Sequence, residues 1–265
     1  MPDLSRYESP YRTIRERLDY GYHDTFIGRH LSGAYTARDD PMLLFTAGAM
    51  GAGKSHYLST LPFKFILIDP DEIAATIPSF EDIGTAFERG SESVAGLERG
   101  TRLRHEARLI TEILLHAAME RNFDIVLDGS LRSYQWYLSE IPRLRQQFRR
   151  YRVELVHIHA PLPEVLRRAA KRETKTGRRV PGALIERSWK DSRRAISVLG
   201  RKKIVDRVQM VDSSGTSPTL IYDSLKDAEW EFRGVPNETS RVDGFLNSVV
   251  EDGDDIAKGK QFFKL

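Results

Sequence analysis

The chain has 265 residues, enough for one large domain or two small ones, and with 40% hydrophobic and 30% charged residues it can bury a core. It contains no cysteine, which excludes disulfides, cysteine nucleophiles and thiolate metal sites. Its net charge of +3 does not by itself indicate a nucleic-acid partner. No apolar run approaches the ~20 residues of a membrane helix. Residues 1–6 lack the basic and apolar regions of a signal peptide, so we expect a cytoplasmic protein with no membrane association.

Residues 1–40 are polar, with a helical pattern around Tyr11–Tyr20, and we expect them to form an N-terminal helical extension. Apolar runs typical of buried strands follow at residues 42–47, 65–68, 125–127 and 153–158, with a weaker one at 208–211. Between these runs, helices are predicted at about 98–121, 134–149 and 163–172. Strands that alternate with helices favour a three-layer α/β/α fold with a mainly parallel sheet. We therefore assign residues 41–212 to the core and residues 213–265 to a C-terminal appendage or tail.

The first predicted strand leads directly into Gly48-Ala49-Met50-Gly51-Ala52-Gly53-Lys54-Ser55, a full match to the P-loop pattern G-x-x-x-x-G-K-[ST]. Glycines allow the N–H groups of such a loop to point at phosphate oxygens, and the helix that follows adds its positive N-terminal end. Lys54 would neutralise the β- and γ-phosphates, and the Ser55 hydroxyl would reach Mg²⁺. The sequence thus predicts a P-loop NTPase-like protein that uses ATP and Mg²⁺. The predicted nucleotide-binding residues are Gly48, Gly51, Ala52, Gly53, Lys54, Ser55 and His56.

Acidic and polar residues follow the next two strands, where ligands of such sheets bind. After the second strand, we assign Asp71 as the base or hydroxyl-orienting group and Asp69 as a support for the metal. Either carboxylate could equally cap the short helix that begins nearby. After the third strand, Asp128 can reach metal or substrate, and Ser130 and Arg132 can hold an anionic or hydroxylated substrate. An acid placed to activate an acceptor hydroxyl favours phosphoryl transfer over simple ATP hydrolysis.

The segment from Arg143 to Arg179 is strongly basic, with twelve arginine or lysine residues against three acids. Within it, a helix followed by a loop with glycine and arginine predicts an Arg-rich helical lid over the phosphates at about residues 163–195. Arginine offsets the negative charge that develops during phosphoryl transfer, so we assign catalytic roles to Arg172 and Arg178. Most of the other basic side chains are expected to be solvated.

Taken in chain order, these motifs resemble the zeta toxin family of P-loop kinases over about residues 43–199. The resemblance rests on the P-loop, Asp69-Pro70-Asp71, Thr111-Glu112 in the long helix, Asp128-Gly129-Ser130-Leu131-Arg132 and Gly177-Arg178. It implies a kinase that moves the γ-phosphoryl group of ATP to a sugar hydroxyl of a nucleotide-linked substrate, which is UDP-N-acetylglucosamine for the bacterial toxins. It also implies that Glu112, Asp128, Ser130 and Arg132 bind this substrate. Asp128 stands where the bacterial toxins usually have a glutamate.

Two other functions are compatible with the sequence. A nucleic-acid 5′-hydroxyl kinase would use the basic segment 143–179 as a groove, and its binding would weaken steeply with salt. An ATP-dependent switch or binding module would hydrolyse ATP without phosphorylating an acceptor. The family resemblance also implies an antitoxin-like protein as a candidate partner, in addition to ATP and a small-molecule acceptor.

Overall fold

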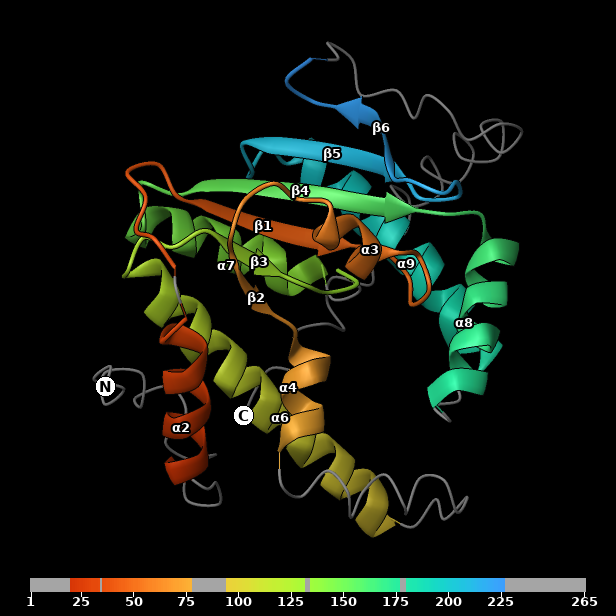
Figure 1. Cartoon of the computed structure of the whole chain (residues 1–265), viewed down its shortest axis with the longest axis horizontal. Helices are drawn as coiled ribbons and strands as arrows, with labels where there is room; N and C mark the ends of the chain where they lie inside the picture. Colours follow the sequence, from red (N-terminus) through yellow and green to blue (C-terminus); the bar gives the residue numbers. More distant parts are fainter. Residues whose placement is uncertain (1–19, 34, 78–93, 132–133, 177–179, 227–265) are drawn as a thin grey trace, which may run out of the picture. The chain divides into compact units, whose positions relative to one another are not determined.

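Strands and helices alternate along the chain, and the strands form one six-stranded sheet with the order β2-β3-β1-β4-β5-β6 (Figure 1). The computed structural model describes residues 20–33, 35–77, 94–131, 134–176 and 180–226. The strands are β1 (Met42–Ala47), β2 (Ile66–Ile68), β3 (Ile125–Leu127), β4 (Arg152–His159), β5 (Arg207–Asp212) and β6 (Thr219–Asp223). The first five are parallel to their neighbours, and β6 is antiparallel to β5. The predicted α/β fold with a mainly parallel sheet is therefore confirmed.

The parallel strands coincide with the apolar runs of the sequence, because helices cover both faces of a parallel sheet and leave no solvated face. β1 and β3 are buried along their whole length, and β4 is buried except at its first residue. β6 differs from the prediction, since it lies beyond residue 212, where we expected the core to end, and extends the sheet by pairing with β5. The first two residues of β6 are exposed, and its short apolar run Leu220-Ile221-Tyr222 lies in the segment that we expected to be an appendage.

The helices of the described residues are α2 (Tyr20–Leu31), α3 (Lys54–Ser59), α4 (Pro70–Thr76), α6 (Val94–Met119), α7 (Tyr134–Gln147), α8 (Leu162–Thr176) and α9 (Gly182–Arg201). The three predicted helices correspond to α6, α7 and α8. The helix predicted around Tyr11–Tyr20 lies outside the described residues except for Tyr20, which begins α2. We expected residues 182–195 only as part of a lid, whereas they belong to the 20-residue helix α9, which packs on β4 and α7.

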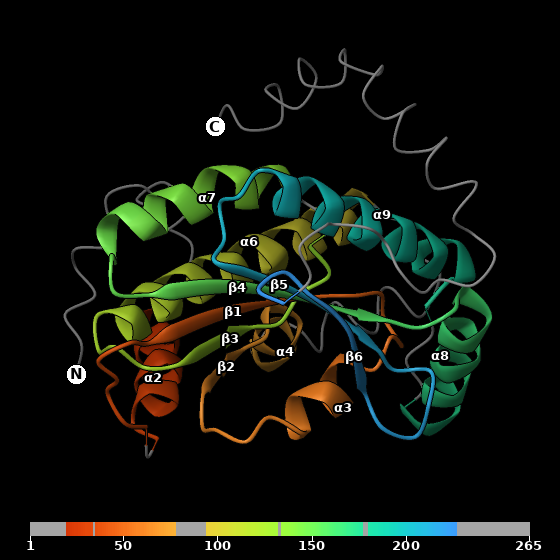
Figure 2. The ribbon, with the colours of Figure 1, turned by 90° about the horizontal axis from the view of Figure 1, so that it is seen from above.

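Helices lie on both faces of the sheet (Figure 2). On one face, Leu58 of α3 joins Leu44, Val126 and Val156 in a buried apolar cluster. The helices α6, α7 and α9 lie on the opposite face (Figure 2). α2 packs along α6 with Ile27 fully buried, so this part of the N-terminal extension contributes to the core. Each such aliphatic side chain stabilises the fold by roughly 1.5–3 kcal/mol when it is removed from water.

The described residues up to Leu225 belong to one compact unit, which contains the described residues of the candidate site. Within the described ranges, no helix is both long enough and apolar enough to cross a membrane.

Candidate active site

The register of the parallel strands brings three polar groups to one edge of the sheet. Leu127 of β3 pairs with Ile68 of β2 on one side and with Phe45 of β1 on the other. The residues that follow these pairs, Asp69, Asp128 and Thr46, therefore lie side by side at the carboxyl ends of the strands. The P-loop begins two residues after Thr46, so phosphate-binding and acidic groups lie at the same edge of the sheet, where ligands of such sheets bind.

The P-loop has a backbone that only glycine adopts readily. Gly51 and Gly53 have φ angles of 88° and 93°, in the left-handed region. A Cβ atom on Gly51 would lie 2.8 Å from the carbonyl oxygen of Val165, so the packing of α8 also excludes a side chain there. Lys54 Nζ donates to Gly48 O at 3.2 Å, which holds its ammonium group back over the loop. This arrangement leaves a curled backbone with one cation beside it, as a phosphate group requires.

Lys54 begins the short helix α3. Ser55 and His56 are exposed in its first turn, and His56 Nε2 lies 3.3 Å from the carbonyl oxygen of Thr216. Ala52 is buried against Val165 of α8, in a cluster that also includes residues of α9. The predicted nucleotide-binding residues thus form one continuous stretch between β1 and α3.

Asp69 and Asp71 occupy different environments. Asp69 caps α4, because its Oδ1 accepts hydrogen bonds from the N–H groups of Asp71 at 2.9 Å and Glu72 at 3.3 Å. Burial, and next the negative charge of Asp128, raise the pKa of Asp69. Asp71 lies in the first turn of α4 with an exposed side chain. The cap that we considered as an alternative is therefore present at Asp69, and it leaves Asp71 facing solvent.

Asp128 is held by the strand that precedes the P-loop. The hydroxyl of the fully buried Thr46 donates to Asp128 Oδ1 and accepts a hydrogen bond from the N–H of Gly129 at 3.1 Å. The N–H of Asp128 donates to Ile68 O at 2.8 Å, which extends the pairing of β2 and β3 by one residue. These contacts fix the Asp128 carboxylate next to Asp69. Thr46 was not identified from the sequence, although its place at the end of β1 follows the same rule as Asp69 and Asp128.

Glu112 lies on α6 and is buried, with Arg108 Nε donating to its Oε1 at 2.9 Å. Burial, and next the charge of Glu140, raise the pKa of Glu112 to about 7, although Arg143 acts in the opposite direction. Tyr137 of α7 lies at the sheet edge, because its hydroxyl is 3.3 Å from where a Cβ of Gly129 would be. Burial, and next the charge of Asp128, raise the pKa of Tyr137, so its phenol keeps its proton.

The remaining predicted residues are only partly described. Ser130 is half-buried just after β3, and Arg172 has an exposed side chain on α8. Arg132 and Arg178 lie outside the described residues.

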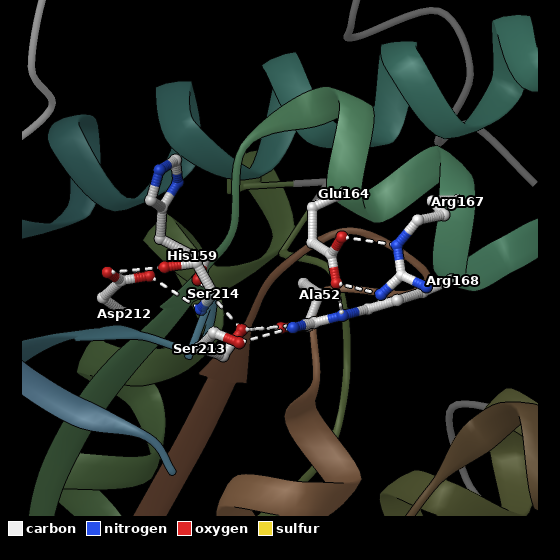
Figure 3. Close-up of polar contacts among 8 residues, drawn as sticks. All are labelled: Ala52, His159, Glu164, Arg167, Arg168, Asp212, Ser213 and Ser214. Carbon is white, nitrogen blue, oxygen red and sulfur yellow. Dashed lines mark hydrogen bonds and ion pairs between the residues drawn. The ribbon is translucent and has the colours of Figure 1, made fainter. Parts of the chain in front are cut away.

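A polar network that the sequence did not indicate joins α8 to the P-loop (Figure 3). Arg168 donates through Nε to Glu164 Oε1 at 2.6 Å, through Nη1 to Ser213 Oγ at 3.3 Å and through Nη2 to Ser213 O at 2.6 Å. The buried hydroxyl of Ser213 lies within hydrogen-bonding distance of Ala52 O and, at 3.0 Å, of His159 O. Ser213 follows β5, so the carboxyl-end rule that located Asp69 and Asp128 would have found it.

Oxygen donors suited to a hard cation gather beside the P-loop. The hydrogen bonds described above use one oxygen of Asp69 and one of Asp128, which leaves the second oxygen of each carboxylate available. Mg²⁺ in phosphotransferases needs only one or two protein oxygens, because substrate phosphates and water complete its shell. Within the described ranges, no group of three or more His, Asp or Glu side chains could hold a metal without such help. The residues therefore fit an ion that arrives with a nucleotide.

A P-loop after the first strand of a parallel sheet, with carboxylates at the ends of two neighbouring strands, is the architecture of a P-loop kinase. The sequence model described as Zeta toxin matches residues 29–227, which is most of the chain. The chain therefore belongs to the zeta toxin family, and it is a nucleotide-binding kinase.

Solved structures show the same fold. A structure of the PezAT chromosomal toxin–antitoxin system of the human pathogen Streptococcus pneumoniae aligns with a TM-score of 0.64 and 16% identity, over 80% of this chain and 85% of that chain. The native AvrRxo1-ORF1:AvrRxo1-ORF2 complex aligns with a TM-score of 0.56 and 16% identity, over 84% of this chain and 72% of that chain. No functionally curated protein matches the sequence.

Proposed function

We propose that this kinase transfers the γ-phosphoryl group of ATP to a hydroxyl of a small, nucleotide-linked acceptor, with UDP-N-acetylglucosamine as the first candidate. The observation that supports this proposal is the pair of carboxylates, Asp69 and Asp128, at strand ends next to the P-loop. The exposed Asp71 follows two residues after Asp69, in the first turn of α4. An enzyme that only hydrolyses ATP does not need a carboxylate placed to orient an acceptor hydroxyl.

In the proposed reaction, the acceptor oxygen attacks the γ-phosphorus, the bond from the γ-phosphorus to the ADP oxygen breaks, and the hydroxyl proton passes to the Asp71 carboxylate. Asp71 has this role because its carboxylate is exposed, whereas one oxygen of Asp69 is engaged in capping α4. Lys54 and the N–H groups of the P-loop, including Gly48, Gly51, Ala52 and Gly53, hold the transferred phosphates.

Two further groups complete the site. Ser55, Asp69 and Asp128 would hold Mg²⁺, which supplies charge neutralisation on the phosphates when it is bound. Arg172 and Arg178 belong to the proposed lid, about residues 163–195, and would offset the negative charge of the transferred phosphoryl group. These arginines need to approach the nucleotide only when it is bound.

The acceptor side of the site consists of Glu112, Asp128, Ser130 and Arg132 in this proposal. Because Glu112 has a pKa of about 7, it holds a proton for part of its population near neutral pH. A protonated carboxyl can donate a hydrogen bond to an acceptor oxygen, whereas an ionised one can only accept. Sugar hydroxyls both donate and accept, so either form can contact them.

A nucleic-acid acceptor is less well supported. The basic segment 143–179 is divided among ion pairs on different elements: Arg145 pairs with Asp206, Arg152 with Asp40 and Arg167 with Glu164. Arginines that neutralise carboxylates of the same chain are less available to a phosphate backbone.

We also propose an antitoxin-like protein partner. The support is that the PezAT structure comes from a toxin–antitoxin system and that the AvrRxo1 structure is a two-protein complex. Comparing the growth of cells that express the wild-type chain with that of cells that express Lys54→Ala tests this part of the proposal. Arrest by the wild type alone would support the need for a neutralising partner, and equal growth would contradict it.

The decisive experiment follows the γ-phosphate of labelled ATP in the presence of Mg²⁺ and a panel of acceptors: UDP-N-acetylglucosamine, NAD, nucleosides and 5′-hydroxyl oligonucleotides. Asp71→Asn should still bind ATP but lose roughly 10²–10⁴-fold in transfer rate. Glu72→Gln is the matched control, because Glu72 is an equally exposed acid in the same turn of α4 and should leave the rate unchanged. Label that appears only as free phosphate, equally in all three proteins, would contradict the proposed transfer.

A further inference from the structure

We propose that Arg168 is a positioning residue of the nucleotide site, which fixes helix α8 on the P-loop and so determines where Arg172 can reach. This inference rests on the proposed function, because the assignment of Arg172 to the transferred phosphate belongs to it. Arg168 is not part of the P-loop, of the acidic groups or of the lid arginines that the sequence identified.

The Arg168 guanidinium is held on two sides before any ligand arrives. Its Nε is bonded to Glu164, one turn earlier on α8, and its two terminal nitrogens are bonded to Ser213 after β5 (Figure 3). The hydrogen bond from Arg167, together with that from Arg168, lowers the pKa of Glu164 to about 2, so Glu164 is ionised at neutral pH. A guanidinium fixed in this way has lost its conformational freedom in advance.

The same network reaches the P-loop itself. The Ser213 hydroxyl lies within hydrogen-bonding distance of Ala52 O, one residue before Gly53. A Cβ atom on Gly53 would lie 3.1 Å from Ser213 Oγ and 3.4 Å from Arg168 Nη1. The Arg168–Ser213 pair therefore lies against the loop at Gly53, directly before α3, and a change in this contact would affect the loop there.

One face of α8 combines this contact with an apolar one. Val165 packs on Ala49 and Ala52, and its carbonyl oxygen lies 2.8 Å from the Cβ position of Gly51. Arg168 and Arg172 follow at three and seven residues from Val165, spacings that lie on one side of a helix. Arg172 is thus about 6 Å further along the axis than Arg168, on the same face of α8.

Arg167 provides a matched control within the same helix. It also pairs with Glu164, at 2.7 Å through both Nε and Nη2, but its side chain is 64% exposed, against 24% for Arg168. Among the described residues, Arg167 bonds to Glu164, whereas Arg168 bonds to both Glu164 and Ser213. Replacing Arg167 removes an arginine and an ion pair from α8 but leaves the contact between Arg168 and Ser213 in place.

The test uses full-length Arg168→Gln, Arg168→Lys, Ser213→Ala and Arg167→Gln, with phosphoryl-transfer kinetics and amide hydrogen exchange of residues 162–176 as readouts. We expect Arg168→Gln to lower kcat roughly 10- to 100-fold through misplacement of Arg172, and to speed exchange in α8. Arg168→Lys should recover part of both, and it replaces Arg168→Gln if that variant does not fold. Ser213→Ala should have a smaller effect, because Ser213 O remains as an acceptor, and Arg167→Gln should stay within about twofold of the wild type.

Coupling to Arg172 separates positioning from a general structural role. If Arg168 acts through Arg172, then Arg172→Ala should cost much less in the Arg168→Gln background than in the wild type. Independent, multiplicative losses would overturn the inference, as would wild-type kcat and exchange in Arg168→Gln. If the wild type phosphorylates no acceptor, the proposed function fails, but the rate of ATP hydrolysis and the exchange of α8 still decide the role of Arg168.

Discussion

Glu112 makes the stability of this protein depend on pH in a way that can be worked out from its environment. Its side chain is 10% exposed, so water screens it poorly. Burial, and next the charge of Glu140, raise its pKa from 4.5 to about 7. A pKa difference of this size between the unfolded and the folded chain corresponds to about 3 kcal/mol of folding free energy.

The sign of the effect follows from proton binding. Between pH 4.5 and 7 the folded protein keeps a proton on Glu112 that the unfolded chain has lost, so stability falls as pH rises through this window. His157 acts in the opposite direction, because burial lowers its pKa from 6.5 to about 3, and stability rises with pH between those values. The two contributions oppose each other in the wild type, so only a comparison with a variant isolates Glu112.

Glu112→Gln keeps an oxygen that can accept the hydrogen bond from Arg108, but it does not titrate. The free energy of unfolding of this variant, relative to that of the wild type, should therefore rise by about 3 kcal/mol as pH rises from 4.5 to 7. The contribution of His157 is common to both proteins and cancels in this difference. Unfolding in urea at half-unit intervals of pH measures the difference directly. A difference between Glu112→Gln and the wild type that does not change with pH would refute the reasoning.

Two further substitutions test the nucleotide end of the site. Lys54→Ala should abolish turnover and weaken ATP binding, because it removes the cation beside the P-loop; loss of the rise in melting temperature on adding ATP and Mg²⁺ would show this. Gly53→Ala should cost about 1–3 kcal/mol and impair ATP binding, because its φ is 93° and a Cβ would lie 3.1 Å from Ser213 Oγ. Gly28→Ala is its control: Gly28 lies in α2 with no atom within 4 Å of its Cβ position, so the change should stabilise the protein by up to about 1 kcal/mol. Equal tolerance of both alanines in thermal unfolding would contradict the tight loop geometry.

Much of the fold could be predicted because buried parallel strands are uninterrupted apolar runs. β1 and β3 have the predicted bounds for this reason, and β4 differs by one residue at each end. β6 was not predicted, because the three apolar residues Leu220-Ile221-Tyr222, the first of them exposed, do not by themselves establish a strand. Its place depends on pairing with β5, which is a tertiary contact.

The candidate site also has one part that could be predicted from the sequence and another that depends on tertiary contacts. The P-loop and the aspartates after β2 and β3 could be predicted because their positions follow from strand order alone. Arg168 could not, since an arginine on an amphipathic helix normally faces solvent, and its partner Ser213 lies 45 residues away. The sequence resemblance identified Glu112, but its buried environment depends on Glu140 and Arg143 of α7, which only folding brings near it.

In the proposed function, selectivity for the acceptor resides in side chains near the sheet edge: Glu112 of α6, Tyr137 of α7 and Asp128 after β3. The P-loop contacts phosphates through backbone groups, which any P-loop kinase supplies, so it cannot distinguish one acceptor from another. On the acceptor side of the site, the shorter carboxylate of Asp128 lies beside the protonated phenol of Tyr137, and Glu112 holds or releases a proton near neutral pH. An ionised Glu112 can accept a hydrogen bond from a hydroxyl but not from an anionic group, whereas protonated Glu112 can donate to either. In this proposal the identity of the acceptor depends on these three side chains, and the kinase chemistry can be established independently of it.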